Sequence, residues 1–77
     1  MTLKIISSTD TLFEGEVKSV TLPGAKGSFM VLQNHASLVS TLVAGKIVYV
    51  ADEEPAELEV GGGIVDVDNN VVSVCIF

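Results

Sequence analysis

The sequence contains no arginine and no tryptophan, and it has only one cysteine and one histidine. The chain has four lysines and ten carboxylates, which gives a formal net charge of -6. A protein that binds nucleic acid needs a basic face and usually arginine, so we expect no nucleic-acid partner. The same charge opposes binding to an anionic membrane surface.

Long apolar runs are also missing. No run approaches the roughly 20 residues that a membrane-spanning helix needs, so no membrane insertion is expected. The N-terminus lacks the apolar core of a secretory signal, which favours a cytoplasmic setting. Cys75 is the only cysteine, so an internal disulfide is excluded, and one cysteine with one histidine cannot supply a zinc quartet.

What the sequence does contain is a high share of short, β-branched apolar runs, with 48 % hydrophobic residues overall. No apolar stripe of helical period appears, so we predict an all-β fold. Residues 1–77 are enough for one domain, in which nearly every apolar side chain is needed for the core. About eight to ten short strands would close into a flattened two-sheet β-sandwich or barrel.

Turn residues and alternation divide the chain into these strands. A bent strand over residues 11–22 needs a bulge near Lys18 and Ser19, because Val17 and Val20 are out of register. We predict a turn at Ala44 and Gly45 and a bend at residues 61–63. A two-residue turn is predicted at Asn69 and Asn70, where asparagine tolerates the left-handed conformation.

Two apolar runs, residues 29–32 and 38–42, are separated by a polar stretch that contains His35. The pattern predicts that they form a hairpin with a polar tip. For His35 two interpretations stay open, and both can hold. The ring can bond a backbone carbonyl and steady the loop, or it can contact a partner at an exposed tip.

Catalytic and ligand-binding patterns are weak. His35 has no second histidine and no serine or cysteine nucleophile in a recognisable context. The three glycines at 61–63 are not followed by a helix, so they do not predict a phosphate-binding loop. The acidic residues 52–54 lack the ligand spacing of a calcium loop and are interpreted as a solvated tip. We expect no enzymatic activity, no metal and no cofactor.

An ordered set of short motifs resembles the N-terminal domain of the epsilon subunit of F-type ATP synthase, across essentially the whole chain. The family pattern has proline after the His-Ala pair, and here Ser37 follows Ala36. The matching segments are residues 7–13, 15–17, 19–24, 27–29, 34–38, 62–63, 65–67 and 70–71.

The resemblance implies a non-catalytic rotor subunit of the central stalk. Such a subunit couples rotation of the c-ring to the gamma subunit during ATP synthesis driven by the proton-motive force. Its place would be the cytoplasmic face of the bacterial inner membrane, peripherally, through the ATP synthase complex. Family members commonly continue into a helical hairpin that restrains ATP hydrolysis. We expect that helical domain to be absent here.

The resemblance also suggests docking residues. One end of the sandwich would stand on the polar loops of the c-ring, and a flank would pack against gamma. The expected c-ring contacts are Ser28, Gln33, Asn34, His35 and Ala36. The candidate gamma contacts are Ser8, Thr9, Asp10, Thr11, Leu38, Leu42 and Val43.

Two rival functions remain open from the residues alone. The first is a generic β-sandwich module that binds another protein partner, which co-purification with gamma would distinguish. The second is a small β-barrel enzyme or ligand carrier. That function predicts a sizeable apolar pocket with convergent polar groups, and a filled interior would argue against it.

Overall fold

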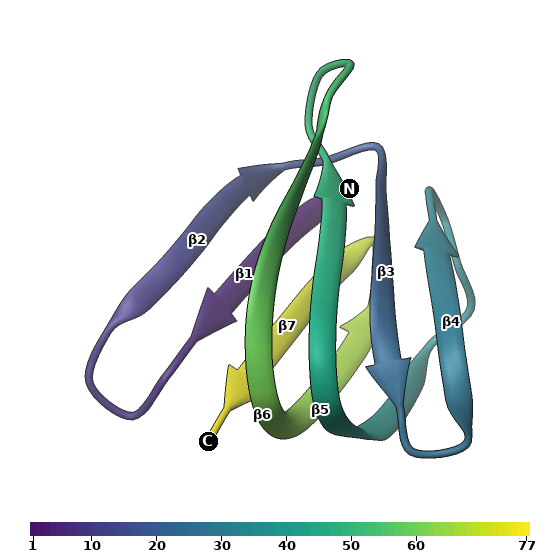
Figure 1. Ribbon diagram of the computed structural model, residues 1–77. Coiled ribbons are helices and arrows are strands. Elements are labelled where there is room, and N and C mark those ends of the chain that lie inside the picture. Colours follow the sequence, from purple (N-terminus) through teal and green to yellow (C-terminus); the bar gives the residue numbers. More distant parts are fainter.

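The structure is a computed structural model that describes residues 1–77. It consists of seven strands (Figure 1), and no helix in it is long and apolar enough to cross a membrane. The strands are β1 (Thr2–Ile6), β2 (Thr11–Glu16), β3 (Ser19–Gly24), β4 (Gly27–Leu32), β5 (Leu38–Val50), β6 (Pro55–Asp68) and β7 (Val71–Ile76). The all-β prediction is confirmed.

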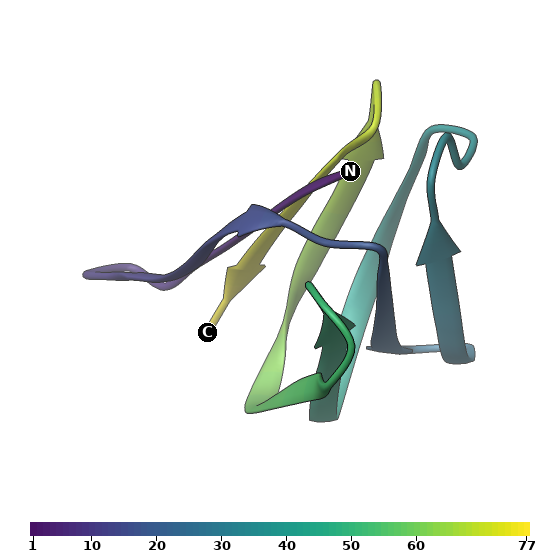
Figure 2. The same ribbon diagram turned by 90° about the horizontal axis from the view of Figure 1, so that it is seen from above.

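All seven strands belong to one hydrogen-bonded sheet in the order β2-β1-β7-β6-β5-β3-β4. The sheet folds over into two layers because β5 and β6 are long and bent, so each strand serves both layers. Residues 62–68 of β6 continue into the layer of β7, β1 and β2. Residues 46–50 of β5 pair with β6, and residues 48–50 also pair with β3, which lies beside β4 (Figure 2).

Glycines permit these bends. The paired strands continue through Gly45 on β5 and through residues 61–63 on β6, where the sequence predicted a turn and a bend between separate strands. Gly62 has a φ of 150°, a conformation that other residues rarely adopt. Each predicted break is therefore a bend inside one strand. For this reason the structure has seven strands rather than eight to ten.

The predicted hairpin of residues 29–32 and 38–42 is wrong. β4 pairs with β3 and not with β5, and β3 lies between them. Ala25 and Lys26 form the tight connection between β3 and β4, and Gly27 takes a φ of 125° there. The polar stretch 33–37 instead carries the chain from β4 in one layer to the start of β5 in the other.

Residues 17 and 18 make a similar crossing between the layers. The Val17 N–H donates to the Met1 carbonyl at 2.8 Å, and the Lys18 N–H donates to the Val50 carbonyl at 2.6 Å. The sequence predicted one bent strand over residues 11–22 with a bulge near Lys18 and Ser19. The change of direction lies there, but it separates two strands, β2 and β3, which belong to different layers. Asn69 and Asn70, with φ values of 54° and 64°, confirm the predicted left-handed turn between β6 and β7.

The core between the layers holds 14 buried residues, all of them apolar. Alternation places them: every second residue of β1, β3 and β7 is buried while its neighbours face outward. The first and last strands, β1 and β7, lie side by side in parallel, with Leu3 opposite Val72 and Ile5 opposite Val74. The filled interior argues against the predicted alternative of a ligand carrier.

We predict that Gly63→Ala is strongly destabilising. A methyl group at Gly63 would lie 2.5 Å from the Cys75 carbonyl oxygen and 3.1 Å from the Ile76 Cα, so the backbone of β7 would have to shift. The expected loss in the free energy of unfolding is about 1–3 kcal/mol. Urea unfolding followed by circular dichroism measures it.

Gly61→Ala is the matched control for this prediction. Its methyl group would sit 3.7 Å from the Phe77 carbonyl oxygen, an ordinary contact, so stability should stay near the wild-type value. Equal urea midpoints for the two variants would contradict the close approach of β6 to β7.

Candidate docking surfaces

The polar loop 33–37 is fixed to the neighbouring turn by side-chain hydrogen bonds. The Asn34 N–H donates to Asn70 Oδ1 at 2.9 Å, and Asn70 Nδ2 donates to Gln33 Oε1 at 3.3 Å. The Ser37 hydroxyl donates to Asp68 Oδ1 at 2.7 Å. Residues 33–37 and 68–70 therefore form one surface, here called the asparagine end. It surrounds a hollow of about 330 Å³.

His35 belongs to this surface and is exposed to solvent. Its Nδ1 lies 2.7 Å from the Ala36 carbonyl oxygen, which confirms the interpretation that the ring bonds a backbone carbonyl. The other ring nitrogen, Nε2, has no hydrogen-bond partner within the chain. Contact with a partner remains a prediction, and the ring is placed where such a contact can form.

The N-terminus lies against the asparagine end. The Met1 ammonium donates to Gln33 Oε1 at 3.0 Å and lies 3.5 Å from Glu16 Oε1. The Thr2 hydroxyl also donates to Glu16. This hydrogen bond and, second, the ammonium charge lower the pKa of the Glu16 carboxyl below its usual value. Three segments far apart in the sequence thus meet at one end of the sandwich.

The expected c-ring contacts do not all lie at this end. Gln33, Asn34, His35 and Ala36 do, but Ser28 lies near the start of β4, opposite Pro23. Gln33 is five positions after Ser28, and five steps along an extended strand correspond to about 16 Å. In Figure 1, β4 runs between the two positions, from the β3–β4 turn to its arrowhead. The prediction that one end of the sandwich gathers the whole set is wrong.

The candidate gamma contacts are divided as well. Ser8, Thr9 and Asp10 form the exposed turn between β1 and β2, where the Ser7 hydroxyl oxygen accepts the N–H groups of Thr9 and Asp10. Thr11, also exposed, begins β2.

The remaining candidates lie on β5, three strand positions away from β1. Val43 is exposed and Leu38 is half-buried, whereas Leu42 is 3 % exposed and belongs to the core. Burial therefore removes Leu42 from the docking candidates.

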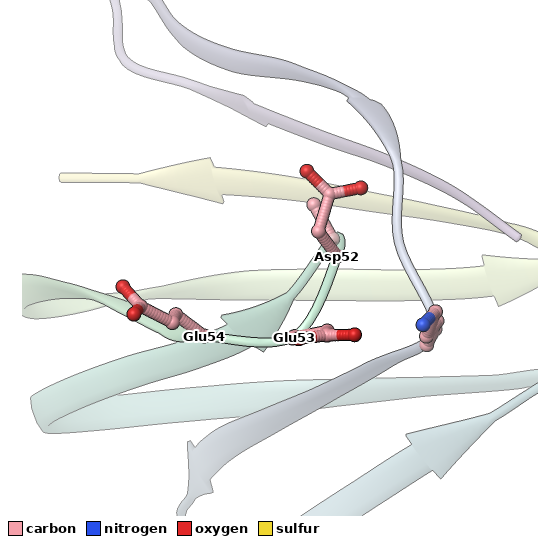
Figure 3. Close-up of a pocket in the computed structure, with 5 residues that line it drawn as sticks. Asp52, Glu53 and Glu54 are labelled. Carbon is pink, nitrogen blue, oxygen red and sulfur yellow. The ribbon is translucent and has the colours of Figure 1, made fainter.

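The acidic residues 52–54 sit at the tip of the β5–β6 hairpin. Figure 3 shows Asp52, Glu53 and Glu54 pointing in different directions rather than toward one point. They line a surface hollow together with Lys18. Divergent carboxylates agree with the interpretation of a solvated tip.

Sequence reasoning missed one group of exposed apolar side chains. Met30 and Leu32 on β4 are each 55 % exposed, and Val39 on β5 is 71 % exposed. The misassigned hairpin placed β4 beside β5 and so hid the fact that β4 is an edge strand. The signal was present in the alternation of residues 27–32, because Phe29 and Val31 face inward and the other residues face outward.

We predict that Glu16→Gln reduces the acid sensitivity of the fold. Because folding lowers the pKa of Glu16, its stabilising effect is present above the unfolded-state pKa and is lost as pH falls through the folded-state value. Between pH 7 and pH 3 the urea midpoint should fall less in the variant than in the wild type. Glu14→Gln is the control, because Glu14 on the same strand makes no ion pair or side-chain hydrogen bond. An identical pH dependence for all three proteins would contradict the prediction.

Comparison with known proteins places this architecture in a family. The domain described as "ATP synthase, Delta/Epsilon chain, beta-sandwich domain" matches residues 1–76. A relative named ATP synthase epsilon chain, from Leptospira borgpetersenii, is 38 % identical over 74 residues. The alignment covers 96 % of this chain and 58 % of the relative, so the chain spans a little over half the length of that protein.

Solved structures share the fold at low sequence identity. A chain of the mitochondrial ATP synthase of Euglena gracilis, in an assembly of OSCP, F1 and c-ring, superposes with a TM-score of 0.90 at 21 % identity, covering 96 % of this chain and 48 % of that one. A chain from the central stalk and c-ring of the Tetrahymena thermophila mitochondrial ATP synthase superposes with a TM-score of 0.84 at 14 % sequence identity. The superposition covers 99 % of this chain and 62 % of that one. From the match across residues 1–76, the chain belongs to the family of ATP synthase delta/epsilon chain β-sandwich domains.

Proposed function

We propose that this protein is a non-catalytic rotor subunit of the central stalk of an F-type ATP synthase. In that role it transmits rotation of the c-ring to the gamma subunit during ATP synthesis driven by the proton-motive force. The observation that carries the proposal is the family match over residues 1–76. The name of the Leptospira relative and the central-stalk assembly of the Tetrahymena neighbour support it.

The physical character of the domain suits a coupling element. Transmission of torque requires a body that does not deform, and here two layers of one continuous sheet enclose an entirely apolar core. The crossings between the layers at residues 17–18 and 33–37 are tied by backbone or side-chain hydrogen bonds. The complex would hold the protein at the cytoplasmic face of the bacterial inner membrane as a peripheral subunit.

The asparagine end is the proposed contact with the c-ring. Its exposed polar groups are amides, the Ser37 hydroxyl, the Asp68 carboxylate and the His35 ring, which can hydrogen-bond to polar loops of a ring. Its own hydrogen bonds hold it in one shape. Ser28 belongs to a different surface. The exposed turn at residues 8–10, together with Thr11, Leu38 and Val43, stays as the candidate gamma interface.

Reconstitution tests the overall proposal. Addition of the chain to an ATP synthase depleted of epsilon should restore proton pumping that is coupled to ATP hydrolysis. Binding to purified gamma, measured by co-purification, should accompany it. A chain that binds neither gamma nor the depleted enzyme would contradict the proposal and favour a β-sandwich module with another partner.

We predict that His35→Ala weakens association with complexes that contain the ring, while binding to isolated gamma changes little. The variant removes the ring and its Nε2 from the exposed asparagine end. Sedimentation of the chain with detergent-solubilised enzyme, with and without the c-ring, measures the difference.

Ser28→Ala is the paired variant, since Ser28 lies on another surface and should leave the ring contact unchanged. Thermal unfolding of both variants checks that the fold is intact. If His35→Ala sediments like the wild type, the His35 ring stabilises only the loop and makes no contact with the ring of c subunits. If Ser28→Ala is the weaker binder, the β3–β4 turn and not the asparagine end faces the ring.

A further inference from the structure

Strand β4 forms one open edge of the sheet. It is the last strand in the order and pairs only with β3 (Figure 1). Natural proteins protect such edges with charges, proline or bulges, because unpaired backbone groups invite another strand. The other edge, β2, carries Glu14 and Glu16. β4, with the sequence Gly-Ser-Phe-Met-Val-Leu, has no charge, no proline and no register shift.

The register shows which backbone groups of β4 are free. In an antiparallel pair, hydrogen-bonded and non-hydrogen-bonded residue pairs alternate. Pro23 has no N–H and stands opposite Ser28, so this pair is a non-hydrogen-bonded one. By alternation, Phe29 and Val31 bond to β3, whereas Ser28, Met30 and Leu32 direct their backbone groups away from the sheet.

One of these outward-directed backbone groups already makes a hydrogen bond within the chain. The Leu32 carbonyl accepts the His35 N–H at 3.3 Å. The N–H groups of Ser28, Met30 and Leu32 and the carbonyls of Ser28 and Met30 remain, enough for a short added strand. The side chains of Met30 and Leu32, each 55 % exposed, would gain cover from such a strand.

Charge is distributed unevenly around this edge. Residues 17–51, which contain β3, β4, β5 and their connections, include three lysines and no carboxylate. Lys46 pairs with Glu57 at 3.4 Å, and Lys18 shares a hollow with the acidic tip. Lys26, at the β3–β4 turn, makes no ion pair. It borders a hollow of about 540 Å³ that Phe29 and Val39 also line.

We propose that β4 is a strand-addition site for an extended segment of the gamma subunit. The segment pairs along residues 28–32, presents apolar side chains at alternate positions and places a carboxylate near Lys26. This inference rests on the proposed function. A second copy of the chain fits less well, because its β4 offers no carboxylate to Lys26 and its acidic β2 edge would produce an open, head-to-tail array.

Amide hydrogen exchange tests the pairing directly. The ¹⁵N-labelled chain is mixed with unlabelled, purified gamma, and exchange is followed by nuclear magnetic resonance. Strand addition predicts new protection, by about tenfold or more, at the N–H groups of Ser28, Met30 and Leu32. Phe29 and Val31 already bond to β3 and should change less.

The outcomes separate this inference from the proposed function. Binding of gamma without this alternating protection overturns the strand-addition site and leaves the rotor role intact. No binding of gamma overturns both. Alternating protection that appears in the chain alone and grows with its concentration identifies a second copy as the occupant, and so overturns the assignment to gamma.

Substitutions give an independent readout. Met30→Lys places a charge on the edge and should weaken gamma binding by about tenfold or more. Val71→Lys is the matched control, because Val71 is also exposed but lies on β7, an internal strand, and it should leave affinity within about twofold. Lys26→Glu should weaken binding most at low salt. Equal losses for Met30→Lys and Val71→Lys would overturn the proposal.

Discussion

The continuity of β5 and β6 through their bends is the constraint on which the rest of the structure depends. These two strands are paired with each other along most of their length, and each contributes residues to both layers. The layers are therefore joined by backbone hydrogen bonds as well as by side-chain packing. Gly63 permits this arrangement, since β7 passes so close that any side chain would meet its backbone. A sandwich built in this way resists sliding of one layer over the other.

Local patterns predicted much of the fold. Alternation indicated short strands, and the paired asparagines at 69–70 predicted their own turn, because each of these signals depends on neighbouring residues only. The pairing of β4 could not be predicted from local patterns. Residues 29–32 and 38–42 are two apolar runs separated by a short polar stretch, which is the sequence pattern of a hairpin. The competing partner of β4 is β3, joined to it by a tighter turn at Ala25 and Lys26.

The docking surfaces were predictable to the same extent. The polar character of residues 33–37 and the backbone contact of the His35 ring followed from local chemistry. The hydrogen bonds of Gln33 to the N-terminal ammonium and to Asn70 could not be predicted from local chemistry. They join positions more than 30 residues apart. The error over Ser28 has the same origin as the error over the hairpin. A loop at each end of β4 was taken for two loops at one end.

The parallel pairing of β1 with β7 has a consequence for synthesis in the cell. Leu3 and Ile5 can pair with Val72 and Val74 only after almost the whole domain has been translated. The layer that contains β1 and β7 cannot form until β7 has been synthesised. Until then the apolar side chains of β1 stay exposed to solvent. The nascent domain is thus a candidate for chaperone protection until its last strand emerges.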